Sequence, residues 1–172
     1  MAIIGGGAVG QLTALAAQTA GAGLVVVVEP NESRRAFARA QGAIDAHPDE
    51  AAALVKRLTD GDGADVVVEA VGANATLDLA TALARARGRI VSVGAHAQPQ
   101  WNLPLARAFR DELSFSFAIG DGMRLRRRLL RLVTDGALDP TVVIDARGRL
   151  EDAPALYTQL AKLERMKAVL TV

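Results

Sequence analysis

Residues 2–10, with the sequence AIIGGGAVG, set the architecture that we expect of this chain. Three apolar residues suited to a buried strand precede glycines in the spacing GxGxxG, and a segment of helical period follows at residues 9–19. In this pattern Gly5 permits a tight turn, Gly7 lets backbone approach a pyrophosphate, and Gly10 lets the helix pack close to the strand. The N–H groups that open the helix, at Ala8 and Val9, then face phosphate oxygens, and the helix dipole adds positive charge. The pattern favours dinucleotide binding, although a glycine-rich turn before a helix is also often no more than a turn.

A second apolar run, residues 24–28, ends at Glu29, 19 residues after Gly10. At the end of the second strand of such a unit, a carboxylate accepts hydrogen bonds from the ribose diol of a dinucleotide and repels a 2′-phosphate. Glu29 therefore favours NAD over NADP, while the neighbouring Arg34 and Arg35 would partly offset that repulsion. The alternative is a solvated glutamate in a loop.

The rest of the chain alternates short apolar runs with stretches of helical period, which predicts a parallel sheet covered by helices. Continuous apolarity, as in residues 25–28 and 66–68, is typical of strands buried on both faces. We therefore expect the α/β class, with a Rossmann-type, doubly wound, six-stranded parallel sheet and helices on both faces. The predicted strands are residues 2–4, 24–28, 43–45, 66–69, 89–93 and 113–119, and the predicted helices are 9–19, 32–41, 49–59 and 75–86.

The composition changes after residue 119, where we expect a helix at 123–134, a strand at 142–145, a helix at 150–163 and a strand at 168–172. These elements give two predicted parts. Residues 1–136 form an NAD-binding Rossmann domain, and residues 137–172 form a C-terminal helix-strand tail.

Composition excludes several classes of function. The 172 residues suit about one domain, and the 51% hydrophobic content is enough for a substantial core. The net charge of +1 gives no general attraction to nucleic acid or anionic membrane. With no cysteine, the chain has no disulfides, thiolate zinc sites, iron–sulfur clusters or cysteine nucleophiles. No apolar stretch is long enough to span a membrane and no signal peptide is recognisable, so we expect a soluble, cytoplasmic protein.

Two further strand ends are predicted to line the same crevice, because ligands of this fold bind outside the carboxyl ends of the strands. Val71 and Gly72 follow the fourth strand, and Gly94, Ala95 and His96 follow the fifth. Small residues there leave room for backbone contacts to a ribose and a nicotinamide. Without the first motif they would be ordinary loop glycines.

Taken together, these segments resemble the cofactor-binding half of the medium-chain, zinc-type alcohol dehydrogenase superfamily. The resemblance runs from end to end and rests on residues 5–10, 25–35 (VVVVEPNESRR), 63–72 (GADVVVEAVG), 88–94 (GRIVSVG), 150–160 (LEDAPALYTQL) and 167–170 (KAVL). It implies that Glu29 holds the adenosine ribose with Arg34 beside it, that Lys167 approaches the pyrophosphate, and that the nicotinamide riboside meets Val71, Gly72, Val93, Gly94 and Ala95.

The resemblance also implies what this sequence lacks. Family members look like two-domain proteins in which a catalytic domain, built mostly from upstream residues, supplies the cysteine and histidine ligands of the catalytic zinc. We therefore assign no catalytic residue and no metal ligand here, and we expect zinc only in that other domain, if at all. On this view the chain resembles a fragment or remnant and is inactive alone, and its last 35 or so residues would normally complete the catalytic domain.

Other chemistry-bearing residues have simpler explanations. His96 lies near the predicted nicotinamide end, but a polar loop residue is favoured over a general base; His47, between Asp45 and Asp49, is predicted at the surface. Arginines at positions 124, 126, 127, 128 and 131 suggest nucleic acid. Helical spacing instead places most of them opposite an apolar stripe of Leu125, Leu129, Leu132 and Val133, and the chain has only six aromatic residues for stacking on bases.

Residues 113–119, LSFSFAI, alternate serines with apolar residues, unlike the other strands. This pattern is typical of an edge strand that pairs with another chain. In the resembled family the corresponding strand joins a symmetry mate, so we expect a homodimer through it; a covered edge is the alternative.

Three functions remain open from sequence. The first is the NAD(H)-binding domain of an alcohol-dehydrogenase-like oxidoreductase, whose parent enzyme transfers hydride between an alcohol or carbonyl substrate and nicotinamide. The second is a non-catalytic nucleotide-binding or dimerisation module. The third, an S-adenosylmethionine methyltransferase, shares the glycine loop and acidic strand end but explains neither Lys167 nor residues 88–94.

Overall fold

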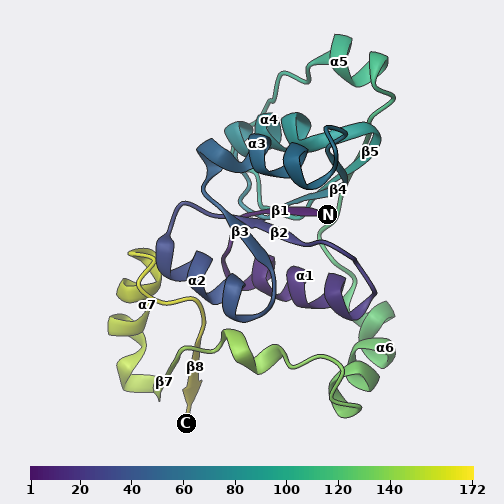
Figure 1. Ribbon diagram of the computed structural model, residues 1–172. Helices are drawn as coiled ribbons and strands as arrows, with labels where there is room; N and C mark the ends of the chain where they lie inside the picture. Colours follow the sequence, from purple (N-terminus) through teal and green to yellow (C-terminus); the bar gives the residue numbers. More distant parts are fainter. The chain divides into compact units, whose positions relative to one another are not determined.

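The computed structural model describes every residue from Met1 to Val172, and the chain divides into two compact units, Met1–Arg124 and Leu125–Val172. The predicted functional boundary at residue 136 remains a prediction. The first unit alternates strands and helices along the chain (Figure 1). Its elements are β1 (Ala2–Ile4), α1 (Ala8–Thr19), β2 (Val26–Val28), α2 (Glu32–Ala40), β3 (Ile44–Ala46), α3 (Pro48–Leu58), β4 (Ala64–Glu69), α4 (Asn74–Leu83), β5 (Ala84–Ser92), α5 (Leu105–Arg110) and β6 (Ser114–Phe117).

The six strands form one sheet in the order β3-β2-β1-β4-β5-β6, and every neighbouring pair is parallel. This order reverses between β1 and β4, which creates the switch point at which ligands bind in doubly wound folds. The predicted Rossmann-type sheet is therefore confirmed. Because all strands run the same way, the ends of β1, β2, β4 and β5 meet at one edge.

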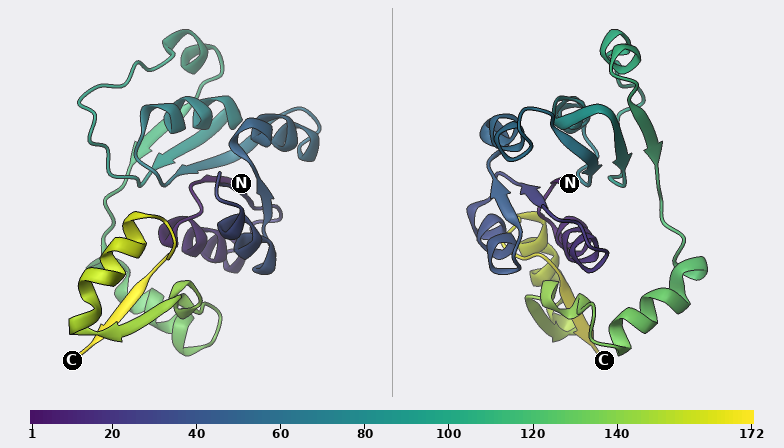
Figure 2. Two further views of the ribbon diagram at one scale, coloured as in Figure 1. Left: turned by 90° about the vertical axis from the view of Figure 1, so that its left-hand side faces the viewer. Right: turned by 45° about the vertical axis from the view of Figure 1, so that its right-hand side comes forward.

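Two apolar cores lie on opposite faces of this sheet. Val26, Val28 and Ile90 belong to the core that α3 and α4 cover, while Ile3 and Val27 belong to the core with Ala14 of α1 and Ala38 of α2. The two helix pairs stay on opposite sides of the sheet as the unit is turned (Figure 2). Val26–Val28 is buried on both faces, as its uninterrupted valines predict.

The largest boundary error in the first unit concerns the start of the fifth strand, predicted at residue 89, and with it the end of the preceding helix, predicted at residue 86. α4 ends at Leu83, and β5 already begins at Ala84. The β4–β5 register shifts after the Ala64–Ala84 pair and resumes at Val66–Arg89, so β5 contains three more residues than β4 between these two pairs, and they form a bulge. Arg87 in this bulge has φ of 61°, a left-handed conformation that sequence periodicity does not reveal. The six-residue helix α5 was also not predicted, because it is too short for a periodic signal.

The second unit contains most of α6 (Gly122–Thr134), then η1 (Pro140–Val143), β7 (Ala146–Arg149), η2 (Leu150–Asp152), α7 (Ala153–Ala161) and β8 (Ala168–Thr171). β7 and β8 pair in parallel, with α7 beside them (Figure 2). The strand predicted at 142–145 was wrong. Pro140 opens a 3₁₀ turn there and the Asp139 side chain accepts a hydrogen bond from the Thr141 N–H, so the strand forms four residues later.

The predicted helix at 150–163 starts as the 3₁₀ turn η2 and is helical only from Ala153. The predicted apolar stripe of α6 is not buried in the structure, since Leu125 and Leu132 are partly exposed and Leu129 and Val133 are exposed. No helix in either unit is long and apolar enough to cross a lipid bilayer.

Candidate functional site

The glycine loop joins β1 to α1 at the switch point of the sheet. Gly5 has φ of 101°, and a Cβ there would lie 2.8 Å from the Val71 side chain, so only glycine fits. A Cβ on Gly10 would lie 1.7 Å from the Gly5 carbonyl oxygen and 3.6 Å from Ile3. The two outer glycines of the motif thus have the structural roles that the sequence predicted, namely the tight turn and the close approach of helix to strand.

Gly7 differs from both, because its φ of −74° suits any residue and a Cβ would come only within 3.9 Å of the Arg34 guanidinium. It is the N-cap of α1, and no side chain caps this helix end. The first N–H groups of the helix, from Ala8 and Val9 onward, have no acceptor within the helix. An open approach, uncapped N–H groups and the positive end of the helix dipole fit a pyrophosphate.

Glu29 ends the second strand and is 95% buried. Its Oε2 accepts the Gly6 N–H at 2.7 Å and its Oε1 accepts the Asn31 N–H at 2.9 Å. The carboxylate is therefore fixed against the glycine loop. With about four lone-pair sites, it keeps acceptor capacity for a ribose diol.

The two arginines near Glu29 differ in their surroundings. Arg35 donates to the backbone oxygens of Glu29 and Pro30, and its guanidinium also pairs with Glu32 and with Asp45. The Arg34 guanidinium instead lies beside Gly7. Arg35 thus braces the β2 end, while Arg34 adjoins the loop.

Gln11 is a site residue that sequence reasoning missed. Its side chain is buried and its amide donates to the Gly6 carbonyl at 3.1 Å and to the Arg34 carbonyl at 3.0 Å. It joins the glycine loop to the start of α2. A lone glutamine in a helix gives no sequence signal for this role.

At the other end of the crevice, the loops after β4 and β5 touch through their glycines. A Cβ on Gly72 would lie 2.3 Å from the Ala95 carbonyl oxygen, and one on Gly94 would lie 2.2 Å from the Gly72 nitrogen. The N–H groups of Val93 and Gly94 both donate to the Glu69 carbonyl. The structure therefore brings the predicted nicotinamide-end residues together with Val71, which is half exposed.

Beneath these loops lies a second buried carboxylate, Glu69, that was not predicted as a site residue. Burial by itself raises the pKa of this carboxyl, but hydrogen bonds from the Gly72 N–H, the Ser92 hydroxyl, the Val71 N–H and the Thr76 hydroxyl outweigh it and hold the pKa below its ordinary value. The available signal was that residues 66–69, VVVE, end like residues 25–29, VVVVE, with a glutamate where the apolar run stops.

Lys167 belongs to the second unit. Its N–H donates to the Asp145 carboxylate at 3.1 Å, and its carbonyl accepts from the Asp145 N–H, which braces the start of β8. Its approach to a pyrophosphate remains a prediction from the family resemblance.

A cavity of about 520 Å³ lies at the opposite, amino-terminal edge of β4 and β5. It is lined by Gly61, Asp62, Arg85, Ala86, Arg87, Arg110, Asp111 and Glu112. Each of its arginines has an acidic partner, namely Asp65, Glu112 and Asp111 respectively. This cavity therefore presents balanced charge, and the glycine-loop edge remains the better candidate site.

No group of three or more His, Cys, Asp or Glu side chains comes close enough to hold a metal ion. The residues present do not fit a zinc site, and we derive no chemical step through zinc for them. His47 lies at the surface as predicted, where it caps α3 by accepting the Asp49 N–H.

Comparison with known proteins supports the same interpretation. A model of the zinc-binding dehydrogenase family matches residues 8–135. The 2-dehydro-3-deoxy-L-galactonate 5-dehydrogenase of Pseudoalteromonas atlantica is 44% identical over 97 residues, which are 55% of this chain and 28% of that protein. The geraniol dehydrogenase of Castellaniella defragrans is 34% identical over 144 residues, covering 81% of this chain and 35% of its own length.

Solved structures extend the similarity to nearly the whole chain. Alcohol dehydrogenase TADH from Thermus sp. ATN1 matches with a TM-score of 0.96 at 31% identity, over 99% of this chain and 50% of that one. A zinc-binding dehydrogenase from Sinorhizobium meliloti, solved with NADP, matches with a TM-score of 0.88 at 28% identity, over 99% and 52%. The chain thus spans less than half of these curated relatives and about half of these solved chains.

Proposed function

The chain belongs to the zinc-binding dehydrogenase family and corresponds to the cofactor-binding domain of its members; on that premise we propose that its glycine-loop edge binds NAD(H) for hydride transfer. The observation that carries this proposal is the pairing of an uncapped helix end with a fixed carboxylate. The N-terminus of α1 has no capping side chain, and the buried Glu29 carboxylate lies one strand away. A pyrophosphate and an adenosine ribose need these two groups side by side.

Each residue of the proposed site binds or orients a part of the dinucleotide. The N–H groups of Ala8 and Val9 donate to pyrophosphate oxygens, and Gly7 leaves that approach free. Val71, Gly72, Val93, Gly94 and Ala95 form the wall against the nicotinamide riboside. When bound, the nicotinamide supplies the hydride chemistry, and the protein supplies position and electrostatics.

The preference for NAD over NADP is part of the proposal. Glu29 carries its negative charge where a 2′-phosphate would lie, and Arg35 is engaged by Glu32 and Asp45. The NADP in the Sinorhizobium meliloti structure belongs to that relative and leaves the choice in this chain to experiment.

The parent activity that fits best is oxidation of an alcohol, or reduction of a carbonyl, by nicotinamide. No residue here is assigned as a proton donor, nucleophile or zinc ligand, so we expect the 172-residue chain to bind cofactor without turnover. A non-catalytic nucleotide-binding or dimerisation module is the second candidate, and it predicts the same binding. A cytoplasmic location, typical of the resembled family, belongs to the proposal too.

We also propose a homodimer through β6. This strand is an edge of the sheet, and its last residue, Phe117, is two-thirds exposed. An edge strand with free N–H and C=O groups and exposed apolar side chains favours pairing with a second copy.

Titration of the purified chain with NADH and with NADPH, followed by cofactor fluorescence, tests the assignment. We expect saturable NADH binding and weaker NADPH binding. The variant Glu29→Gln should lose about tenfold in NADH affinity and less in NADPH affinity, because it loses a charged acceptor for the ribose. Glu50→Gln, an exposed carboxylate in the first turn of α3, serves as the control.

Preferential binding of S-adenosylmethionine over NADH would contradict the proposal and favour a methyltransferase. Equal affinity for NADH and NADPH in both the wild type and Glu29→Gln would contradict the assigned role of Glu29.

A further inference from the structure

Three polar side chains meet beneath the loops that end β4 and β5. The Ser92 hydroxyl lies 2.8 Å from the Glu69 carboxylate and 2.7 Å from Nε2 of His96. The same Nε2 lies 3.4 Å from Glu69 Oε2. Glu69 is fully buried and Ser92 nearly so, while the His96 side chain is 19% exposed. This cluster is not explained by the contacts assigned above to the cofactor.

The available protons fix the direction of each hydrogen bond. Glu69 Oε1 accepts from the N–H groups of Val71 and Gly72 and from the Thr76 hydroxyl, as an ionised carboxylate does. Ser92 has one hydroxyl proton, and it points at Glu69 Oε2. The Ser92 oxygen must therefore accept from His96, which requires the proton of the imidazole on Nε2.

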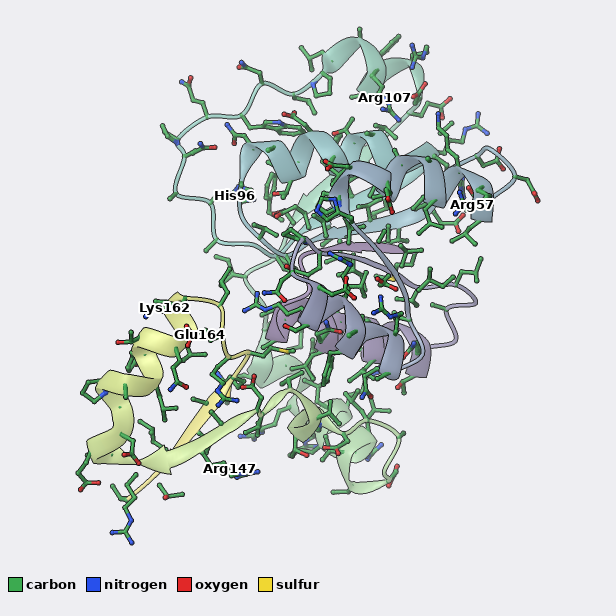
Figure 3. All side chains as sticks on the ribbon, turned by 60° about the vertical axis from the view of Figure 1, so that its left-hand side comes forward. Arg57, His96, Arg107, Arg147, Lys162 and Glu164 are labelled. Atoms are coloured by element: carbon green, nitrogen blue, oxygen red, sulfur yellow. The ribbon has the colours of Figure 1, made fainter.

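These hydrogen bonds hold the loop of residues 93–96, which supplies part of the proposed wall against the nicotinamide riboside. His96 follows Gly94 and Ala95 directly, and those residues touch Gly72 with no space for a side chain between them. The Phe117 ring and the imidazole form a T-shaped contact with a centroid separation of 6.2 Å. In Figure 3 the His96 ring lies against the strands of the first unit, whereas Arg57 and Arg107 lie at its periphery.

We propose that His96 is a positioning residue for the nicotinamide half of the cofactor: as the Nε2–H tautomer, it anchors residues 93–96 to the buried Ser92–Glu69 pair. This inference rests on the proposed function and adds a role for three residues to it. It assigns His96 no proton transfer to substrate, because the Nε2 proton is held by Ser92. Without the hydrogen bond from His96 to Ser92, residues 93–96 can move away from the nicotinamide riboside. This weakens contacts to the nicotinamide half of the cofactor but not to the adenosine half.

Two ligands separate this role from a merely structural one. NADH contacts the whole crevice, whereas ADP-ribose lacks the nicotinamide. His96→Leu keeps the side chain's bulk but has no donor, and His96→Gln restores an N–H that can reach Ser92. We expect His96→Leu to lower NADH affinity about fivefold, the loss of one hydrogen bond, with ADP-ribose affinity unchanged and His96→Gln close to the wild type.

Equal losses for NADH and ADP-ribose in His96→Leu, or no loss for either, would overturn the inference. Wild-type chain that binds ADP-ribose as tightly as NADH would overturn it as well, while leaving the dinucleotide-binding function in place. Wild-type chain that binds neither ligand would overturn the proposed function and this inference together.

A second measurement needs no ligand. The chain has two histidines, so ¹⁵N spectra of the imidazole rings at pH above 8 give two sets of signals, and His47→Asn, which keeps a capping side chain on α3, removes one set. The remaining signals should show His96 protonated on Nε2, and in Ser92→Ala this preference should weaken. A His96 ring protonated mainly on Nδ1 would contradict the anchor.

Discussion

Gly7 and Gly10 are three residues apart in one motif, yet the structure predicts opposite consequences for the same substitution. Gly7→Ala should keep the free energy of unfolding within about 0.5 kcal/mol, because a Cβ fits there, but it should lower NADH affinity about tenfold by placing a methyl group in the path of the pyrophosphate. Gly10→Ala should cost about 3 kcal/mol or more in stability, because its Cβ would overlap the Gly5 carbonyl. Urea denaturation and NADH titration of both variants measure the two effects; wild-type affinity in Gly7→Ala would argue against the pyrophosphate site.

Glu69 gives a prediction for pH. Its pKa is below the ordinary value of 4.5 in the folded chain, so it stabilises the fold above that pH, and this contribution is lost as the pH falls through the folded-state pKa. Glu69→Gln should lower the free energy of unfolding by about 2 to 4 kcal/mol at pH 7, since donors of the ionised group lose their acceptor. The difference from the wild type should shrink in acid. Denaturation followed by Trp101, the sole tryptophan, at pH 7 and pH 3.5 provides the measurement, with Glu50→Gln as control.

A Glu69→Gln variant whose stability deficit is the same at both pH values would show that the carboxylate charge is not what stabilises these loops.

The sequence predicted those residues of the candidate site that lie at a fixed spacing along the chain. Gly5, Gly7, Gly10 and Glu29 have a fixed spacing, and that spacing reflects strand, turn and helix geometry. Glu69, Ser92 and His96 come together only because β4 and β5 are adjacent and parallel. No spacing rule links them, which is why His96 was interpreted as an ordinary loop residue.

At the scale of elements, buried strands were the most predictable feature. Valine runs buried on both faces locate β2 and β4, whereas charged strands such as β7, with sequence ARGR, carry no such signal. The start of β5 was misplaced for a related reason. Arg85, Arg87 and Arg89 line its first half, and only pairing with β4 makes that segment a strand.

The edge strand β6 carries the prediction of a dimer. The Ala118 N–H donates to the backbone carbonyl of Ser92 in β5. Because successive N–H groups along a strand point to opposite sides, the Phe117 N–H points toward the open edge of the sheet. Phe117→Pro should remove that donor and leave a monomer, whereas Phe117→Ala keeps the N–H and should retain the dimer. Sedimentation equilibrium should give twice 18.0 kDa for the wild type and for Phe117→Ala, and 18.0 kDa for Phe117→Pro.

A wild-type chain that sediments as a monomer at all concentrations would contradict the proposed role of β6.

At the scale of the whole molecule, the two units differ in how far they are built around a core. The first contains both apolar clusters of the sheet, while Val143 is the only buried residue after Arg124. Sequence patterning predicted the first unit well because burial imposes a regular pattern on strands and helices. In the second, where little is buried, hydrophobic period is a weak guide, and the 3₁₀ turns at Pro140 and Leu150 were missed.

The most direct test of the account is to map NADH binding on the intact 172-residue chain by ¹⁵N–¹H NMR. The account predicts saturable amide shifts concentrated at residues 5–10, at Glu29 and at residues 71–72 and 93–96, since these surround the two halves of the dinucleotide. A folded chain whose amides do not respond to millimolar NADH, or respond only around Gly61, Arg87 and Arg110 at the opposite edge of the sheet, would contradict it.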